Sequence, residues 1–478
     1  MDASSGLFID GSWRTSKGRS SRAVRNPWDD SIVATVCDAG PSDVQDAVGA
    51  AQRVMDAGDF LPFERYQVLS RASALIAADA EEFARLIVLE AGKPLRDARA
   101  EVARAVHAVQ LCAEEAKRVT GEVIPFSATP GSERRVGFTL PHPIGVVCAI
   151  SSFNAPLVQM MHKAPAALAA GCAVVLKPAE KTPLSAMKFV ETLSEAGLPA
   201  GWLNLVLGGA EVGDQLIADE RFAAYSFTGS VRVGQHIRQG VGLRKTILEL
   251  GNNSPSIVHA DADLELAATA IAKSGFVYAG QMCIAAQRVL VHSAVHDEFL
   301  ELLQEKTRAL IVGDPMDERT DVGPMLSLES AERAVQLIKE TVGAGAECIT
   351  GGTREGSTVT PTILRNVHPG MRIARDEAFS PILAVTSYDT IEEAVELANN
   401  TRFGLQAALF TESLDTAMYI SQRLDTGTVM VNEGSHVRID QMPFGGVKDS
   451  GMGREGIRYA VEEFTSQRLV CLTLKDPV

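Results

Sequence analysis

The sequence has little positive charge and no long apolar run. It carries 45 Lys and Arg residues against 60 Asp and Glu residues, a formal net charge of −15, whereas a nucleic-acid binder needs a basic footprint. The longest apolar stretch, residues 164–176, contains Gly171 and is too short to cross a bilayer. Residues 1–13 lack the basic segment and apolar core of a signal peptide. We therefore expect no nucleic-acid partner, no membrane partner and no signal peptide.

Closely spaced cysteine pairs are also absent. The seven cysteines stand singly, with no Cys-x-x-Cys pair and no histidine at the spacing of a metal ligand. An odd number of scattered thiols argues against a disulfide framework and against a zinc site. We expect a reducing compartment, the cytoplasm, and no bound metal. The cysteines are at positions 37, 112, 148, 172, 283, 348 and 471.

The order of apolar runs indicates an α/β fold with several domains. Between residues 144 and 250, five short apolar runs alternate with helical stretches, which is typical of a parallel, doubly wound sheet. A second alternation of this kind spans residues 254–431. Residues 42–118 are predicted to be helical, whereas residues 119–143 and the last twenty residues are predicted to form exposed strands. The five runs are residues 144–150, 173–176, 203–207, 223–227 and 246–250.

Residues just beyond the apolar runs are candidates for a ligand site, because parallel sheets bind ligands at the carboxyl ends of their strands. Asn154 is either a turn former or an amide donor to an oxyanion. Lys177 and Glu180 are either solvated or hold ribose hydroxyls, and the carboxylate disfavours an added 2′-phosphate. Gly229 and Ser230 precede a helix whose first amides suit a pyrophosphate, although the usual GxGxxG fingerprint is missing.

Glu249 and Cys283 are the two candidates for covalent chemistry. Glu249 lies within the fifth apolar run, where a carboxylate is costly unless it is partnered or used as a general base. Cys283 follows a glycine break at the end of a helical stretch. Most cysteines are inert and buried, but a nucleophilic thiol needs an accessible position that favours the thiolate.

These pieces together resemble the aldehyde dehydrogenase superfamily over essentially the whole chain. Cys283 follows Glu249 by 34 residues, as in the family pattern. The departures, Ser152-Phe153, Asn252 and Ser380, remove no catalytic group. The matching motifs are Lys177-Pro178-Ala179-Glu180, Phe227-Thr228-Gly229-Ser230, Glu249-Leu250-Gly251, Gly280-Gln281-Met282-Cys283, Asp376-Glu377-Ala378-Phe379-Ser380-Pro381 and residues 443–451.

The resemblance implies an aldehyde dehydrogenase fold in three parts. A Rossmann-like cofactor domain would comprise residues 1–118 and 140–251, and a second α/β catalytic domain residues 252–448. A small β oligomerisation element would combine residues 119–139 and 457–478. The resemblance also implies NAD as the cofactor, with NADP as the alternative, a small aldehyde as the substrate, and a homodimer or homotetramer.

The resemblance further assigns roles. Cys283 would attack the aldehyde to give a thiohemiacetal that is oxidised to a thioester, and Asn154 would stabilise its oxyanion. Glu249 would activate the hydrolytic water. Lys177 is grouped with both the catalytic and the cofactor residues, and Glu455 is a candidate proton relay. The expected cofactor residues are Ile150, Ser151, Ser152, Phe153, Lys177, Ala179, Glu180, Gly209, Gly213, Phe227, Thr228, Gly229, Ser230, Val233, Leu250, Gly251, Glu377 and Phe379.

The segments around Arg135 and Arg438 are similar to members that act on small hydroxylated or anionic aldehydes such as lactaldehyde. Arg104, His436 and Arg438 are candidates for the substrate pocket, although surface salt bridging would equally explain them. Met282 stands where phosphate-binding members often carry arginine, which argues against a phosphorylated substrate. Succinic-semialdehyde-type and aromatic aldehyde dehydrogenases are the alternatives.

Two other classes of protein compete with this interpretation. In a dehydrogenase that transfers the acyl group to coenzyme A, a thiol resolves the thioester, so a hydrolytic base such as Glu249 would have no use. A non-catalytic NAD-binding or structural relative would be free to lose Cys283, Asn154 or Glu249, and the sequence retains all three.

Overall fold

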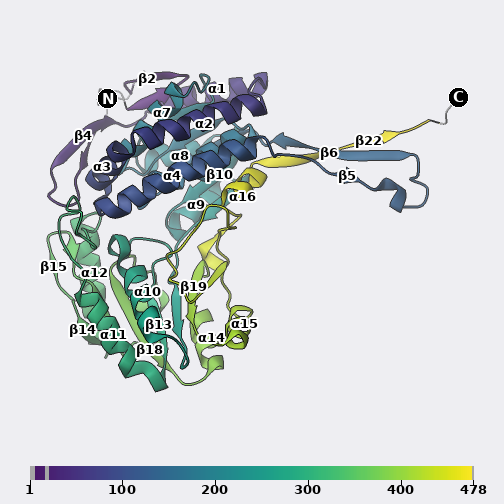
Figure 1. Ribbon diagram of the computed structural model, residues 1–478. Helices are drawn as coiled ribbons and strands as arrows, with labels where there is room; N and C mark the ends of the chain where they lie inside the picture. The colour runs from purple at the N-terminus through teal and green to yellow at the C-terminus, as the bar shows by residue number, and fades with distance from the viewer. Residues whose placement is uncertain (1–5, 17–20, 476–478) are drawn as a thin grey trace.

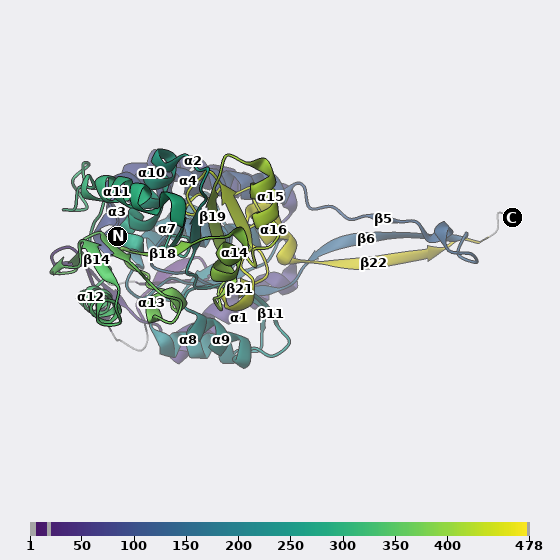
Figure 2. The same cartoon turned by 90° about the horizontal axis from the view of Figure 1, so that it is seen from below.

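The computed structural model describes residues 6–16 and 21–475, which form two α/β bodies and a projecting β-sheet (Figure 1). The first body is built on an eight-stranded sheet and the second on a seven-stranded sheet. A three-stranded sheet extends away from both bodies (Figure 2). Within the described ranges, no helix combines the length and the apolarity needed to cross a membrane.

The first sheet contains the five predicted apolar runs as parallel neighbours. Antiparallel strands extend both edges of this sheet. These edge strands were not predicted, because they are very short and join the sheet by pairing with strands that are distant in the sequence. In spatial order its strands are β2 (Ser12–Arg14), β1 (Leu7–Ile9), β9 (Leu203–Leu205), β8 (Val174–Lys177), β7 (Val146–Ile150), β10 (Phe222–Thr228), β11 (Lys245–Glu249) and β21 (Gly451–Met452).

Helices cover both faces of this sheet. On one side lie α1 (Pro41–Ala57), α8 (Ala210–Ala218) and α9 (Val231–Gly240). On the other lie α2 (Pro62–Ala78), α3 (Ala80–Ala91), α4 (Leu95–Ala116), α5 (Val158–Met161), α6 (Ala164–Ala170), α7 (Leu184–Glu195) and α16 (Ile457–Glu463) (Figure 2). The helical stretch predicted over residues 155–171 is divided into α5 and α6, because Pro165 has no N–H to bond the carbonyl of Met161.

The second body repeats the same architecture. Its central strands are parallel and match the predicted second alternation, whereas β14 and β17 at one edge were not predicted. Its strands in order are β14 (Glu347–Thr350), β17 (Thr362–Arg365), β18 (Ile382–Tyr388), β13 (Arg288–His292), β12 (Pro255–Val258), β19 (Gln406–Phe410) and β20 (Thr428–Val431). Its helices are α10 (Leu264–Phe276), α11 (His296–Arg308), α12 (Leu328–Gly343), α13 (Arg372–Arg375), α14 (Ile391–Asn399) and α15 (Leu414–Ser421).

The projecting sheet consists of β5 (Val123–Ile124), β6 (Arg135–Pro143) and β22 (Thr465–Thr473), paired antiparallel in the order β22-β6-β5 (Figure 2). It carries exposed apolar side chains on both β6 and β22, among them Leu140 and Leu469. The C-terminal range predicted for this element begins at residue 457, at the start of α16, but α16 packs on α4 and α6 of the first body. The projecting part therefore begins at Thr465.

Two short hairpins complete the described chain. The sequence showed little pattern near the N-terminus, yet β3 (Ser21–Arg25) and β4 (Ile32–Cys37) pair antiparallel. A second hairpin joins β15 (Arg354–Glu355) and β16 (Thr358–Val359). Strands this short leave too few residues for an alternating pattern to stand out.

Candidate active site

A cavity of about 810 Å³ lies beyond the carboxyl ends of the parallel strands of the first sheet and reaches the second body. All of the residues predicted to hold the cofactor line it, and Asn154 and Cys283 line it as well. Sequence reasoning did not name Arg232 and His236 of α9 or Asp214 of α8, which also line it. They lie on helix faces rather than at strand ends, so no motif marks them.

The wall around Gly209 and Ser230 suits a phosphate-containing ligand. A side chain at Gly209 would approach the Glu180 carboxylate to 3.0 Å, so the glycine keeps this part of the cavity open. Ser230 caps α9, its hydroxyl accepting from the Val233 amide at 3.4 Å. The free amides and the positive end of the helix dipole of α9 therefore face the cavity.

Lys177 and Glu180 lie at the same end of the cavity, as the sequence predicted for neighbours after β8. Burial lowers the pKa of Lys177, and the Glu180 carboxylate partly offsets this shift. Two further residues join them: Arg22 bonds the Asp38 carboxylate at 2.9 Å and lies 3.8 Å from Glu180. Arg22 and Asp38 come from the N-terminal region, and no sequence motif connected them with this site.

Cys283 is carried by a tight left-handed turn at the end of α10. Tyr278 and Ala279 have φ values of 47° and 52°, and Gly280 follows with 68°. A Cβ at Gly280 would collide with the carbonyl of Ser380, which explains the glycine. Burial raises the pKa of the Cys283 thiol to about 12, opposed by the attraction of the Arg438 guanidinium. The thiol is therefore protonated at neutral pH in the cofactor-free protein.

Asn154 meets the Cys283 loop from the first body. Its side-chain amide donates to the carbonyl of Gln281 at 2.9 Å, and its oxygen accepts from the Ser152 hydroxyl at 2.7 Å. An amide group has two N–H donors, so one remains for a ligand beside Cys283. The structure thus brings together two residues that lie far apart in the sequence.

Glu249 ends β11 and is 2% exposed. Among the described residues, neither of its carboxylate oxygens has a hydrogen-bond partner. Burial raises its pKa well above the ordinary value, and the negative charge of Glu455 raises it further. A carboxylate with a raised pKa is a stronger base than an ordinary glutamate, which suits a general base.

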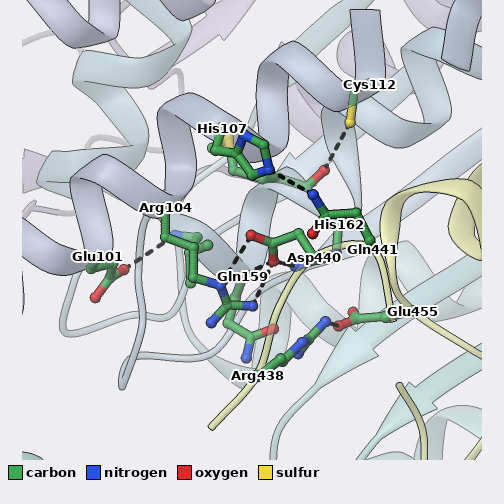
Figure 3. A network of polar contacts seen from close by, with 12 residues as sticks. Glu101, Arg104, His107, Cys112, Gln159, His162, Arg438, Asp440, Gln441 and Glu455 are labelled. Carbon is green, nitrogen blue, oxygen red and sulfur yellow. Dashed lines mark hydrogen bonds and ion pairs between the residues drawn. The ribbon is translucent and has the colours of Figure 1, made fainter. Parts of the chain in front are cut away.

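A buried polar network surrounds this acid (Figure 3). Glu455 contacts Lys163 at 2.6 Å and Arg438 at 3.1 Å, and these two cations outweigh burial to lower its pKa to about 2. Beside them, Asp440 accepts from both Arg104 and His162. The predicted relay residue Glu455 thus lies within a cluster that also contains Lys163, His162 and Asp440, which were not foreseen.

The three predicted substrate residues do not form one group. Arg104 and Arg438 belong to the network, whereas His436 approaches Lys273 and Glu433. Burial lowers the pKa of His436 to about 4, so it is neutral. The assignment of all three to the substrate pocket stays a prediction, and His436 lies near Lys273 of α10.

Comparison with known proteins agrees with this geometry. The pattern of the Aldehyde dehydrogenase family matches residues 13–470. The chain belongs to the aldehyde dehydrogenase family. It is 46% identical to a 3-sulfolactaldehyde dehydrogenase of Priestia aryabhattai, with 98% of each chain covered. It is 39% identical to a lactaldehyde dehydrogenase of Methanococcus vannielii, over 98% of this chain and 99% of the relative.

Comparison of the fold with solved structures indicates the same family. An NAD-dependent aldehyde dehydrogenase of Sinorhizobium meliloti superposes with a TM-score of 0.95 at 35% identity, over 99% of this chain and 95% of that one. The predicted superfamily, its α/β fold and the enzyme class, an oxidoreductase acting on aldehydes, are thereby confirmed.

The high pKa of the Cys283 thiol predicts how its rate of alkylation depends on pH. In cofactor-free protein with Cys471→Ser, which removes the exposed thiol, alkylation of Cys283 by iodoacetamide should accelerate about tenfold per pH unit from 7 to 10, because only the thiolate reacts. Peptide mass spectrometry at each pH measures the rate. Arg438→Met should slow the reaction at every pH, since it removes the cation that favours the thiolate. A plateau below pH 9 would contradict the assigned pKa.

Proposed function

We propose that this aldehyde dehydrogenase uses NAD to oxidise a small hydroxylated or anionic aldehyde to its carboxylic acid through a thioester on Cys283. The proposal rests on one observation: Cys283, the Asn154 amide and the buried acid Glu249 come together at one cavity. The first two line the cavity, and Glu249 ends the strand that leads into it at Leu250 and Gly251.

The catalytic steps divide among these groups. Once ionised, Glu249 has both oxygens free to take a proton from the hydrolytic water. The remaining Asn154 N–H and the Cys283 backbone N–H stabilise the oxyanion that forms after the thiolate attacks. Glu455, held between Lys163 and Arg438, is a fixed negative charge that raises the pKa of Glu249 and so strengthens it as a base. Lys177 stays with the cofactor, because it lies at the Glu180 end of the cavity.

The cavity accommodates a dinucleotide with the residues predicted for it. When bound, NAD accepts the hydride from the substrate carbon. Lys177 and Glu180 would hold the adenosine ribose, the α9 N-terminus the pyrophosphate, and Glu377 the nicotinamide ribose. Glu377 accepts from the Asn252 amide at 2.8 Å, and Phe379 packs against Phe153 with ring centroids 5.8 Å apart.

An unbalanced charge beside Cys283 supports an anionic substituent on the substrate. Arg104, Lys163 and Arg438 contribute three positive charges, whereas only Glu455 and Asp440 are negative. The buried His162, whose pKa burial lowers to about 4, is neutral near pH 7, and burial favours the uncharged form of Glu249. Among the described residues, Arg438 Nε has no acceptor although the side chain is 3% exposed. The relative named for 3-sulfolactaldehyde acts on an aldehyde of this class.

The three predicted parts complete the proposal. The first body would bind the cofactor, the second would carry the nucleophile, and the projecting sheet would join copies into a homodimer or homotetramer. Exposed apolar residues on β6 and β22 support this last role, since such side chains favour a partner surface over water. The cytoplasm is the proposed compartment, consistent with seven free cysteines.

Turnover of an aldehyde panel tests the proposal. NADH formation should be fastest with 3-sulfolactaldehyde, lactaldehyde or a semialdehyde, slower with glyceraldehyde 3-phosphate and benzaldehyde, and absent in Cys283→Ala. Glu249→Gln should still release a burst of NADH, but hydrolysis of the thioester should slow at least 100-fold. An active Cys283→Ala enzyme would refute the mechanism, and a protein that binds NAD yet oxidises nothing would indicate a non-catalytic relative.

Arg438→Met should lower kcat/KM for an anionic aldehyde at least tenfold more than for propanal, because only the anionic substrate loses a charge-assisted hydrogen bond. Arg438→Lys, which keeps the charge, should restore part of the difference. The ratio of the two kcat/KM values is the readout, since an effect on the thiolate alone would lower both equally. An unchanged ratio would exclude Arg438 as the anion-binding group.

Glu180→Gln should increase the affinity for NADP at least tenfold relative to NAD, because it removes the carboxylate that repels a 2′-phosphate. Dissociation constants of both cofactors, measured by protein fluorescence without substrate, check this. Glu211→Gln, at an acidic position of α8 outside the cavity lining, is the control and should leave the ratio unchanged. An unaltered ratio in Glu180→Gln would place cofactor selection elsewhere.

A further inference from the structure

Lys93 and Glu101 form a buried ion pair outside the active-site cavity. Their side chains are 7% and 4% exposed, and neither lines the cavity. Lys93 follows the end of α3. Glu101 lies in α4 (Figure 3). Burying two charges is expensive and rarely adds stability by itself. The contacts that each side chain makes with the active-site segments explain why the pair is buried here.

Glu101 holds the segment that carries Asn154. One of its oxygens pairs with Lys93, and the other accepts from the backbone amides of Leu157 and Val158 at 2.9 and 3.1 Å. These amides begin α5 three residues after Asn154. The carboxylate thus fixes the turn between β7 and α5 from the α4 side.

Lys93 reaches the segment that carries Cys283. Its ammonium lies 4.9 Å from the centre of the Tyr278 ring, and the Tyr278 hydroxyl donates to the carbonyl of Ala91 at 2.6 Å. Tyr278 is 1% exposed and packs in the core of the first body, although it belongs to the second. It opens the left-handed turn that leads to Cys283.

The segment held by Glu101 and the segment contacted by Lys93 meet at the active site, where the Asn154 amide donates to the carbonyl of Gln281. We propose that Glu101, with its counter-ion Lys93, is a positioning residue that fixes the Asn154 amide against the Cys283 loop. This inference rests on the proposed function of Asn154 as the oxyanion donor. Loss of the carboxylate frees two amides and lets Asn154 shift, so the oxyanion loses its donor while the cofactor residues on β8 and at the start of α9 keep their places.

Two matched double variants test the proposal without leaving an unpaired buried charge. Lys93→Met/Glu101→Gln keeps an acceptor for Leu157 and Val158, whereas Lys93→Met/Glu101→Leu removes it. The first should keep kcat within about threefold of wild type, and the second should lose about 10- to 100-fold, the effect expected when a reacting group is misplaced. The dissociation constant for NAD should not change in either variant.

A control separates positioning from loss of stability. Glu90 is also fully buried and accepts from the amides of Leu184 and Ser185 at the start of α7, which carries no catalytic residue. Glu90→Leu should lower the melting temperature as Lys93→Met/Glu101→Leu does, yet keep kcat at saturating NAD. Equal losses of kcat in both would mean general loosening and would overturn the proposal.

A double-mutant cycle shows whether Glu101 acts through Asn154. Adding Asn154→Ala to Lys93→Met/Glu101→Leu should lower kcat little beyond Asn154→Ala alone, because the same interaction is already lost. If the losses of kcat from the two sets of substitutions multiply in the combined variant, the inference is overturned, while the oxyanion role of Asn154 stands. A fully active Asn154→Ala enzyme would instead refute that role, and the positioning inference with it.

Discussion

The left-handed turn at Tyr278, Ala279 and Gly280 is the constraint on which the active site depends. Each non-glycine residue in this conformation costs about 1–3 kcal/mol unless its surroundings enforce it. Here the Tyr278 ring is buried in the core of the opposite body, and the Gln281 side chain bonds the carbonyls of Tyr278 and Pro324. The turn therefore aims Cys283 across the junction of the two bodies. A straight continuation of α10 would carry the thiol away from Asn154.

Burial of charge is the second constraint, and it divides the two carboxylates near Cys283 into opposite states. Lys163 and Arg438 pair with Glu455 and lower its pKa, whereas Glu249 has no hydrogen-bond partner among the described residues and burial raises its pKa. The negative charge of Glu455 raises the pKa of Glu249 further. The difference between their environments makes Glu249 the stronger base of the two and keeps Glu455 as a fixed negative charge.

The sequence predicted the parts of the fold that depend on local patterns. Buried parallel strands such as β7 and β10 are continuous apolar runs, and a strand-end residue such as Glu249 breaks that pattern. The edge strands β1, β14 and β21 pair with partners hundreds of residues away or are too short to show a period. Similarly, Lys163 and Asp440 could not be assigned, because a buried charge is recognisable only beside its partner.

The chain as a whole carries a net charge of −15, yet the buried network holds the three cations Arg104, Lys163 and Arg438. At physiological ionic strength the field of exposed carboxylates fades within about 8 Å, whereas buried pairs are screened much less. The proposed anionic aldehyde would therefore be repelled weakly at a distance and attracted strongly once it has lost water beside Arg438. In such a site, selection for charge would occur after entry and would depend on the buried cations rather than on the charge of the surface.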